Sequence, residues 1–236
     1  MLEYLKNKRI LVVVAHPDDE LLGLGATMHK LIHQYNCETR VVILGEGITS
    51  RSDFRDVQKW KKELETHKNN IKEAQKAIGY HSVEVYDFPD NRFDTVALLD
   101  IIKVIEKEKK DFLPEVIFTH HGGDVNIDHQ KTFEAVVTAC RPMKEECVKT
   151  IITFETPSGT EWRASSDPKQ FVPNMFVEIS QEDLQAKIKG MESYEFEKRA
   201  FPHPRSPKAL EILAQQRGIM VGKELVESFM IIRNIN

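Results

Sequence analysis

Residues 10–20 of the chain read ILVVVAHPDDE, an apolar run that ends in an imidazole, a proline and three carboxylates. Five aliphatic residues in succession, bounded by a proline, predict a short buried strand that ends near Ala15. Ionisable groups at the end of a buried strand are costly unless a cation or a reaction uses them. Pro17 suits the first position of a helix, and such a helix would place His16 and Asp19 on the same side. The stretch therefore predicts half of a metal site.

The sequence around this stretch alternates short β-branched runs with longer segments of helical periodicity. The runs predict strands at residues 9–14, 38–44, 83–88, 115–119 and 149–154, and the longer segments predict helices at 20–34, 56–78, 96–109 and 130–139. This alternation is typical of a parallel sheet covered by helices. We therefore expect an α/β, Rossmann-like layered fold with a mostly parallel sheet.

The pattern changes after about residue 156. Proline-rich connections there accompany predicted helices at 182–197 and up to residue 218, and a closing strand at 226–232. The prolines between the two helices fit neither a regular helix nor a central strand, so they predict an irregular surface segment. We expect a single domain over residues 1–236, with a Rossmann-like core at 1–156 and an irregular α+β C-terminal extension at 157–236.

The composition excludes several kinds of ligand and site. With 37 acidic and 33 basic residues the net charge is −4, and the basic face that phosphate-backbone binding needs is lacking, so nucleic acid is not the expected ligand. No apolar run is long enough for a membrane span and the N-terminus lacks a signal-peptide pattern, so we expect a cytoplasmic protein. The three cysteines are widely spaced and predict neither a disulfide framework nor a thiolate zinc site. Whether the chain forms a homo-oligomer is left open.

A second cluster of histidines and aspartates follows the strand predicted at 115–119. Residues 119–129 read THHGGDVNIDH. Because ligands bind at the carboxyl edge of an open parallel sheet, this loop and the one that begins at His16 can meet in space. Imidazole and carboxylate ligands with an open position suit catalytic Zn²⁺, with Fe²⁺ as a substitute.

The hexapeptide AHPDDE at 15–20 and the segment DVNIDH at 124–129 together resemble the PIG-L or LmbE-like superfamily, which includes zinc-dependent N-acetylglucosaminyl de-N-acetylases. The resemblance extends to Gly45-Glu46 and to residues 160–162. It implies that His16, Asp19 and His129 ligate the metal and that Asp18 is the general base. It further implies that a small-molecule amino sugar is the substrate, with acetate and a free amine as products.

The second motif departs from the family pattern at Asn126. Many members have a histidine there, beside the developing oxyanion. An asparagine can still donate a neutral hydrogen bond to an oxyanion, but it cannot act as an acid. We therefore place Asn126 and Asp128 with Asp18 among the catalytic residues, and take His120, His121 and His203 as imidazoles that could replace the missing one.

Several further residues are candidates for binding the substrate. Arg51 resembles a family loop arginine that contacts the sugar or its substituent, and Glu46 lies on the same sheet edge. Of the successive His120 and His121 only one should face the site, and we expect His121 because it adjoins the glycines. The remaining candidates are Asp124, the stacking surface Trp162, and His203 and Arg205 of the proline-rich segment, whereas His29, His33, His67 and His81 are expected to be structural.

The leading hypothesis is a metal-dependent hydrolase that removes the N-acetyl group from an N-acetylated amino sugar or from its nucleotide or glycoconjugate derivative. One alternative keeps the metal and changes the bond, giving an amidase that acts on an amino acid or thiol conjugate. Another is a non-catalytic carbohydrate-binding protein that retains the metal site. The sequence identifies neither the sugar nor its substituent.

Overall fold

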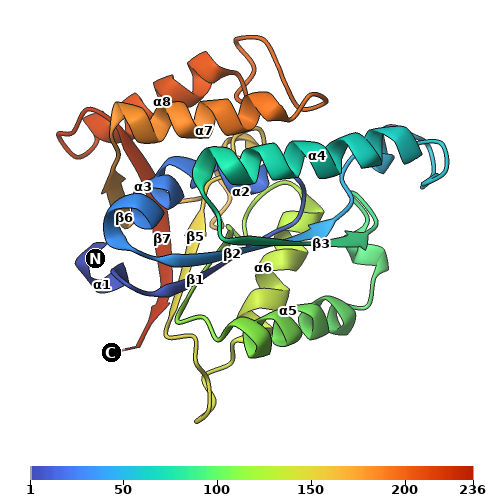
Figure 1. Cartoon of the computed structure of the whole chain (residues 1–236), viewed down its shortest axis with the longest axis horizontal. Coiled ribbons are helices and arrows are strands. Elements are labelled where there is room, and N and C mark those ends of the chain that lie inside the picture. Colours follow the sequence, from blue (N-terminus) through green and yellow to red (C-terminus); the bar gives the residue numbers. More distant parts are fainter. Residues whose placement is uncertain (1, 236) are drawn as a thin grey trace.

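The computed structural model describes residues 2–235, and its centre is a seven-stranded sheet (Figure 1). The strand order is β3-β2-β1-β4-β5-β7-β6, and the first five of these strands run parallel while β7 is antiparallel to both of its neighbours. The strands are β1 (Arg9–Val14), β2 (Glu38–Gly45), β3 (Ser82–Phe88), β4 (Val116–His120), β5 (Thr150–Phe154), β6 (Met175–Glu178) and β7 (Val226–Asn234).

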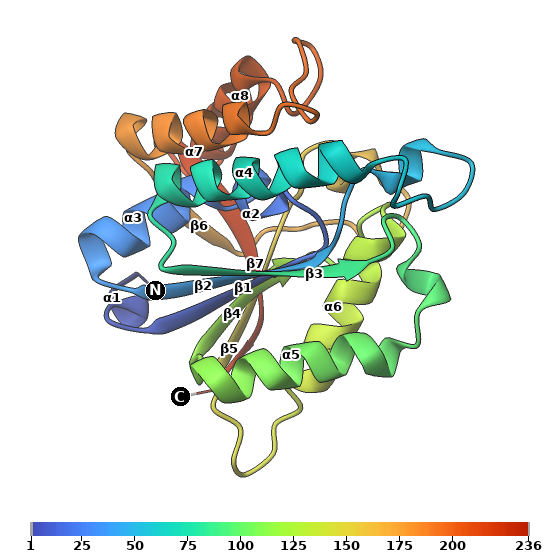
Figure 2. The same ribbon diagram turned by 45° about the vertical axis from the view of Figure 1, so that its right-hand side comes forward.

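Helices cover both faces of the sheet (Figure 2). One face carries α2, α3, α4 and α7, and the other carries α5 and α6. The α-helices are α1 (Leu2–Leu5), α2 (Asp19–Leu22), α3 (Gly25–Tyr35), α4 (Lys61–Ile78), α5 (Leu98–Phe112), α6 (Ile127–Ala139), α7 (Gln181–Ser193) and α8 (Pro207–Ile219). Short 3₁₀ turns lie at η1 (Thr49–Arg51), η2 (Phe93–Thr95) and η3 (Thr160–Trp162).

The central strand β1 is buried on both faces, which explains its unbroken apolar run. Ile10, Val12 and Val14 belong to the core between the sheet and α3, α4 and α7, whereas Leu11 and Val13 belong to the core beneath α5 and α6. Side chains alternate between the two faces of a strand, so a strand covered on both sides must be apolar at every position. Among the described residues, no helix combines the length and the apolar composition that crossing a membrane requires.

The predicted fold class is confirmed, and so are the first five predicted strands to within one residue at each end. The helix predicted at 20–34 is in fact two helices, because Leu24 leaves the helical conformation, with φ −146° and ψ 1°. At the preceding Gly23 a Cβ atom would lie 2.3 Å from the carbonyl oxygen of Glu155, so only glycine fits there. The helix predicted from residue 56 begins only at Lys61, since the Asp56 carboxylate accepts the N–H of Lys59 and closes a separate turn. The four-residue strand β6 was not predicted.

The C-terminal extension is joined to the parallel part by a buried ion pair. Lys187 of α7 donates to Glu227 of β7 over 2.7 Å, and each residue is only 4% exposed. The other carboxylate oxygen of Glu227 accepts the N–H of Thr27 at 2.7 Å, in the first turn of α3. One carboxylate therefore links α7, β7 and the start of α3.

Candidate active site

The predicted site residues meet at the carboxyl ends of the parallel strands. His16 lies two residues beyond β1 and Asp19 opens α2, while Asp128 and His129 lie in the first turn of α6, which follows β4. All four are buried. The sheet topology places β4 next to β1, so the two loops that the sequence analysis expected to meet do lie together.

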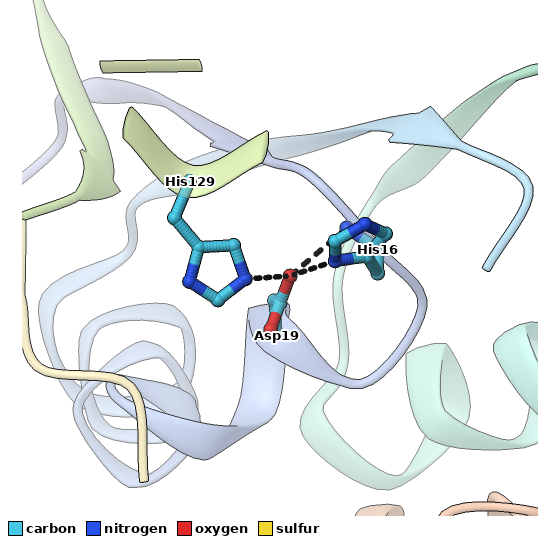
Figure 3. Close-up of side chains that lie close together, drawn as sticks. All are labelled: His16, Asp19 and His129. Atoms are coloured by element: carbon cyan, nitrogen blue, oxygen red, sulfur yellow. Dashed lines mark hydrogen bonds and ion pairs between the residues drawn. The ribbon is translucent and has the colours of Figure 1, made fainter. Parts of the chain in front are cut away.

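The carboxylate of Asp19 lies between two imidazole rings (Figure 3). Its Oδ2 is 3.4 Å from His16 Nδ1 and 3.3 Å from His129 Nε2. One ligand atom from each of the three residues lies within 4.8 Å of the others, which is the arrangement of a three-ligand metal centre. The backbone N–H of His16 also donates to Asp19 Oδ2 at 2.9 Å and fixes the carboxylate.

The second nitrogen of each of these rings faces a buried carboxylate. His16 Nε2 is 2.8 Å from Asp128 Oδ2, and His129 Nδ1 is 3.3 Å from Asp124 Oδ2. A histidine that ligates a metal typically gives its other ring N–H to a carboxylate, which sets the tautomer and the ring orientation. His16 therefore has the hydrogen-bonded carboxylate expected of a metal ligand, whereas His129 has a carboxylate in ion-pair contact with its Nδ1. Each ring keeps one nitrogen directed at Asp19.

The charges of the cluster also suit a cation. Burial lowers the pKa of His129, but Asp19 and Asp124 outweigh that effect and raise it to about 9. Burial raises the pKa of Asp19, but the imidazoles of His129 and His120 hold it well below its usual value. Positive charge is thus stabilised where the three ligand atoms converge. Two neutral imidazoles and one carboxylate match the donor preferences of Zn²⁺ and of Fe²⁺.

His120, rather than His121, adjoins this cluster, so the expectation for His121 is wrong. His121 Nε2 contacts the carbonyl oxygen of Lys169 at 2.7 Å and lies outside the pocket. The ring of His120 stacks on that of His129 at 3.9 Å, and its Nε2 accepts the N–H of Ala15. Strand alternation was the right argument, but β4 extends through His120, which directs that residue to the site. Burial and the charge of His129 lower the pKa of His120 to about 4, so this ring is neutral.

Asp18 has a strained backbone. Its φ of 101° lies in the left-handed region, at a cost of about 1–3 kcal/mol for a residue other than glycine. The helix begins after it, so Pro17 is not the first helical residue as expected, and Asp18 is the N-cap of α2. His16 and Asp19 nevertheless face each other. Burial raises the pKa of Asp18 well above its usual value, although Arg205, whose Nη1 is 2.8 Å from Asp18 Oδ2, opposes the rise.

The side chain of Glu20 stabilises this strained turn by a hydrogen bond to its backbone. Its Oε2 accepts the N–H of Asp18 at 2.9 Å, and its Oε1 accepts the hydroxyl of Tyr194 at 2.5 Å. The hydroxyl of Tyr80 donates to the Glu20 carbonyl oxygen at 2.7 Å. Burial raises the pKa of Glu20 to about 7 against the hydrogen bond from Tyr194. Glu20 therefore lies outside the reacting groups and supports the conformation of Asp18.

A polar pocket of about 280 Å³ opens beside the cluster. This volume is slightly below the usual range of ligand pockets, roughly 300–1,000 Å³. The predicted residues that line it are His16, Asp18, Arg51, Asn126, Trp162, His203 and Arg205.

Besides His121, two predicted substrate residues do not line this pocket. Glu46 is paired with Arg55 and accepts the hydroxyl of Thr49, and it lines a separate groove between α4 and β3. Asp124 is fully buried and accepts the hydroxyl of Thr160 at 2.7 Å. Glu46 therefore braces a loop, and Asp124 supports His129.

Asn126 is an N-cap that also faces the pocket. Its Oδ1 accepts the N–H of Asp128 at 2.8 Å, and its Nδ2 donates to Asn91 Oδ1 at 3.0 Å. The amide is thus oriented by two bonds and has one further N–H to offer. Asn126 therefore caps α6 and lines the pocket as well.

Sequence reasoning missed two carboxylates of the pocket wall. Asp90 follows β3, and its Oδ1 is 3.3 Å from His16 Nε2 while Oδ2 accepts the N–H groups of Ile48 and Ser50. Its position after a third predicted strand was a usable signal, because that strand ends at the same sheet edge. Glu197 joins Arg51 and Arg205 at 2.5 and 2.8 Å, and no spacing in the sequence indicated it.

Comparison with known proteins gives one family and one curated relative. The model of the PIG-L family, described as GlcNAc-PI de-N-acetylase, matches residues 11–140. The uncharacterized deacetylase YaiS of Escherichia coli (strain K12) is 26% identical over 194 residues, which are 80% of this chain and 91% of YaiS. Both support deacetylase activity, and neither identifies the substrate.

Solved structures share the fold over nearly the whole chain. The N,N'-diacetylchitobiose deacetylase of Pyrococcus horikoshii superposes with a TM-score of 0.75 at 15% identity, covering 96% of this chain and 84% of that one. GalB, the 4-carboxy-2-hydroxymuconate hydratase of Pseudomonas putida KT2440, superposes with a TM-score of 0.72 at 17% identity, covering 97% and 98%. At these identities the likeness establishes the fold alone, and the same fold serves both a deacetylase and a hydratase.

Proposed function

The chain belongs to the PIG-L family, and on this premise we propose that it is a metal-dependent deacetylase that removes the N-acetyl group from an N-acetylated amino sugar, free or within a nucleotide or glycoconjugate derivative. The observation that carries the proposal is the convergence of His16, Asp19 and His129, with a carboxylate beside each outer ring nitrogen, next to the carboxylate of Asp18. The small volume of the pocket agrees with a substrate of sugar size.

In this proposal His16, Asp19 and His129 hold Zn²⁺ or Fe²⁺. Such a cation, when bound, supplies acidification of a water molecule and polarisation of the amide carbonyl. Asp18 lines the pocket next to the cluster, and its raised pKa suits a group that takes a proton from the attacking water and returns one to the leaving amine. Arg205 fixes the Asp18 carboxylate in place, and Asn126 offers its remaining N–H to the oxyanion.

Arg51 is proposed to bind the substrate away from the amide that is cleaved. It lines the pocket, and Glu197 and the carbonyl oxygen of Phe196 hold its guanidinium. A guanidinium fixed in this way suits the recognition of a sugar oxygen or of the sugar's substituent. Asp128 acts through His16 as its hydrogen-bond partner and does not touch the substrate.

The test is acetate release from a panel of N-acetylhexosamines, their 1-phosphates and their nucleotide derivatives. The chain is assayed after chelation and again after addition of one equivalent of Zn²⁺ or Fe²⁺. We expect release that depends on the metal for at least one member of the panel. Release that is unchanged by chelation would refute the metal's role, and no release from any sugar by protein with a stoichiometric metal would refute the sugar.

An amidase that acts on an amino acid or thiol conjugate is the second candidate. The asparagine at position 126, where many family members have a histidine, lines the pocket, and this departure from the family pattern leaves room for a different substrate. The same protein assayed with N-acetylated amino acids separates the two candidates. Metal binding without hydrolysis of either class would instead indicate a binding protein.

A further inference from the structure

Trp162 and His203 form a distinct part of the pocket wall, here called the Trp162–His203 subsite. Both come from the C-terminal extension, one from η3 and the other from the segment that joins α7 to α8. Their ring centroids are 6.4 Å apart and the rings are nearly perpendicular, at 85°. Neither residue belongs to the metal cluster or contacts Asp18 directly.

His203 is held rigidly on its turn. Its backbone N–H donates to the carbonyl oxygen of Ala200 at 3.0 Å, and its own carbonyl oxygen accepts the N–H of Ser206 at 2.9 Å. Ser206 is the N-cap of α8, so the turn is continuous with a helix. A polar group held in this way loses little conformational freedom when it binds a ligand.

The ring of His203 has a defined tautomer. Its Nδ1 accepts the backbone N–H of Arg205 at 3.2 Å, so the proton of the neutral ring is on Nε2. The nearby charges favour the neutral form, since burial together with Arg205 and Arg199 lowers the pKa of His203 while Glu197 opposes them. At neutral pH His203 is therefore a donor through Nε2–H, without a charge.

Trp162 provides an apolar surface next to this donor. Its side chain is 57% exposed although it lines the pocket. Burial of an exposed indole face against a ligand is favourable, and ligand sites commonly combine aromatic surface with a few fixed polar groups. A sugar ring has an apolar face of C–H groups and an edge of hydroxyls, which matches this pair.

We propose that the Trp162–His203 subsite recognises the sugar ring of the substrate, with Trp162 packed on its apolar face and His203 Nε2–H donating to one ring hydroxyl. The inference rests on the proposed function, because it assumes an amino sugar. It makes His203 a residue that determines which sugar is accepted, separate from the groups that cleave the amide.

The experiment combines variants of His203 with deoxygenated substrates. The N-acetyl sugar that the wild type hydrolyses best is compared with its 3-, 4- and 6-deoxy analogues. One analogue should lose roughly 2- to 12-fold in kcat/KM, the worth of one neutral hydrogen bond. His203→Leu should show the same loss on the parent sugar and no further loss on that analogue, and His203→Gln, which keeps an N–H donor, should recover part of it. His33→Leu, on an exposed position of α3, is the matched control.

Two results would overturn the subsite while leaving the proposed function in place. One is that each deoxy analogue lowers kcat/KM by the same factor with His203→Leu as with the wild type. The other is a nitrogen-15 NMR spectrum in which the proton of the neutral His203 ring is on Nδ1. A wild type that hydrolyses no amino sugar refutes the proposed function, and the sugar subsite with it.

Discussion

The parallel part of the molecule, residues 9–154, and the C-terminal extension, described here over residues 157–235, contribute different residues to one pocket. The parallel part provides Asp18 and the three converging residues that could hold a metal ion, all near the carboxyl ends of its strands. The extension provides Trp162, Glu197, His203 and Arg205 from a 3₁₀ turn and a proline-rich segment. The residues that could hold a metal ion therefore lie in or directly beside the ends of regular elements, whereas the extension lines the pocket from a short turn and an irregular segment.

This difference indicates how the two regions can change independently. Strand ends in a buried sheet are held by many backbone bonds, so they keep ligand atoms in place. Loops tolerate substitution and insertion far better than the elements that they connect. A fold that hosts both a deacetylase and a hydratase is consistent with chemistry that is set by a few residues on a common scaffold.

The largest expected effect is on the parallel side. Asp18→Asn should lower kcat by on the order of 100- to 10,000-fold, because the amide cannot accept the proton of the attacking water. Metal content should stay stoichiometric, since Asp18 is not one of the three converging ligands. Asp53→Asn, on an exposed loop, is the control, measured by metal analysis and steady-state kinetics. Turnover equal to wild type would remove Asp18 from the role of base.

The next effect tests how firmly the two regions are joined. Lys187→Met leaves Glu227 buried without its cation and should lower the free energy of unfolding by about 3–5 kcal/mol. Lys189→Met, at an exposed position of the same helix, should change it by less than about 0.5 kcal/mol. Denaturant titrations followed by circular dichroism measure both. Equal midpoints would mean that the pair contributes nothing to holding the extension in place.

The smallest of the three effects concerns the support of His16. Asp128 accepts the backbone N–H groups of Asn91 and Phe93 besides its contact with His16 Nε2. Asp128→Asn replaces one acceptor oxygen by a donor, so we expect metal affinity to fall roughly 10- to 100-fold. Competition with a chromophoric chelator measures it, with the exposed Asp111→Asn as control. An unchanged affinity would show that His16 needs no such partner.

The sequence predicted the parallel part far better than the extension, because the parallel part depends on local patterns and the extension on contacts between distant residues. Apolar runs gave the strands because β1 is buried on both faces, and the ordered motif at 15–20 gave residues that the structure brings together. Glu197 is brought to the pocket by the way the segment between α7 and α8 folds back, and no periodicity in the nearby sequence indicates this. His121 was expected to face the site because the strand was predicted to end at residue 119, whereas β4 extends one residue further, to His120. The left-handed conformation of Asp18 is supported by Glu20 and by tyrosines far along the chain, which no local pattern reveals.

The place of β7 between β5 and β6 has a consequence for the order in which the protein forms during synthesis. Strand β6 has its sheet partner in β7, whose residues are translated about 50 positions later. At roughly 5–20 residues per second, β6 waits several seconds on the ribosome before it can pair. His16, Asp19 and His129 emerge long before the C-terminal side of the pocket is complete. Under the proposed function, the residues that would hold the metal ion are therefore synthesised before most of those that would select the substrate.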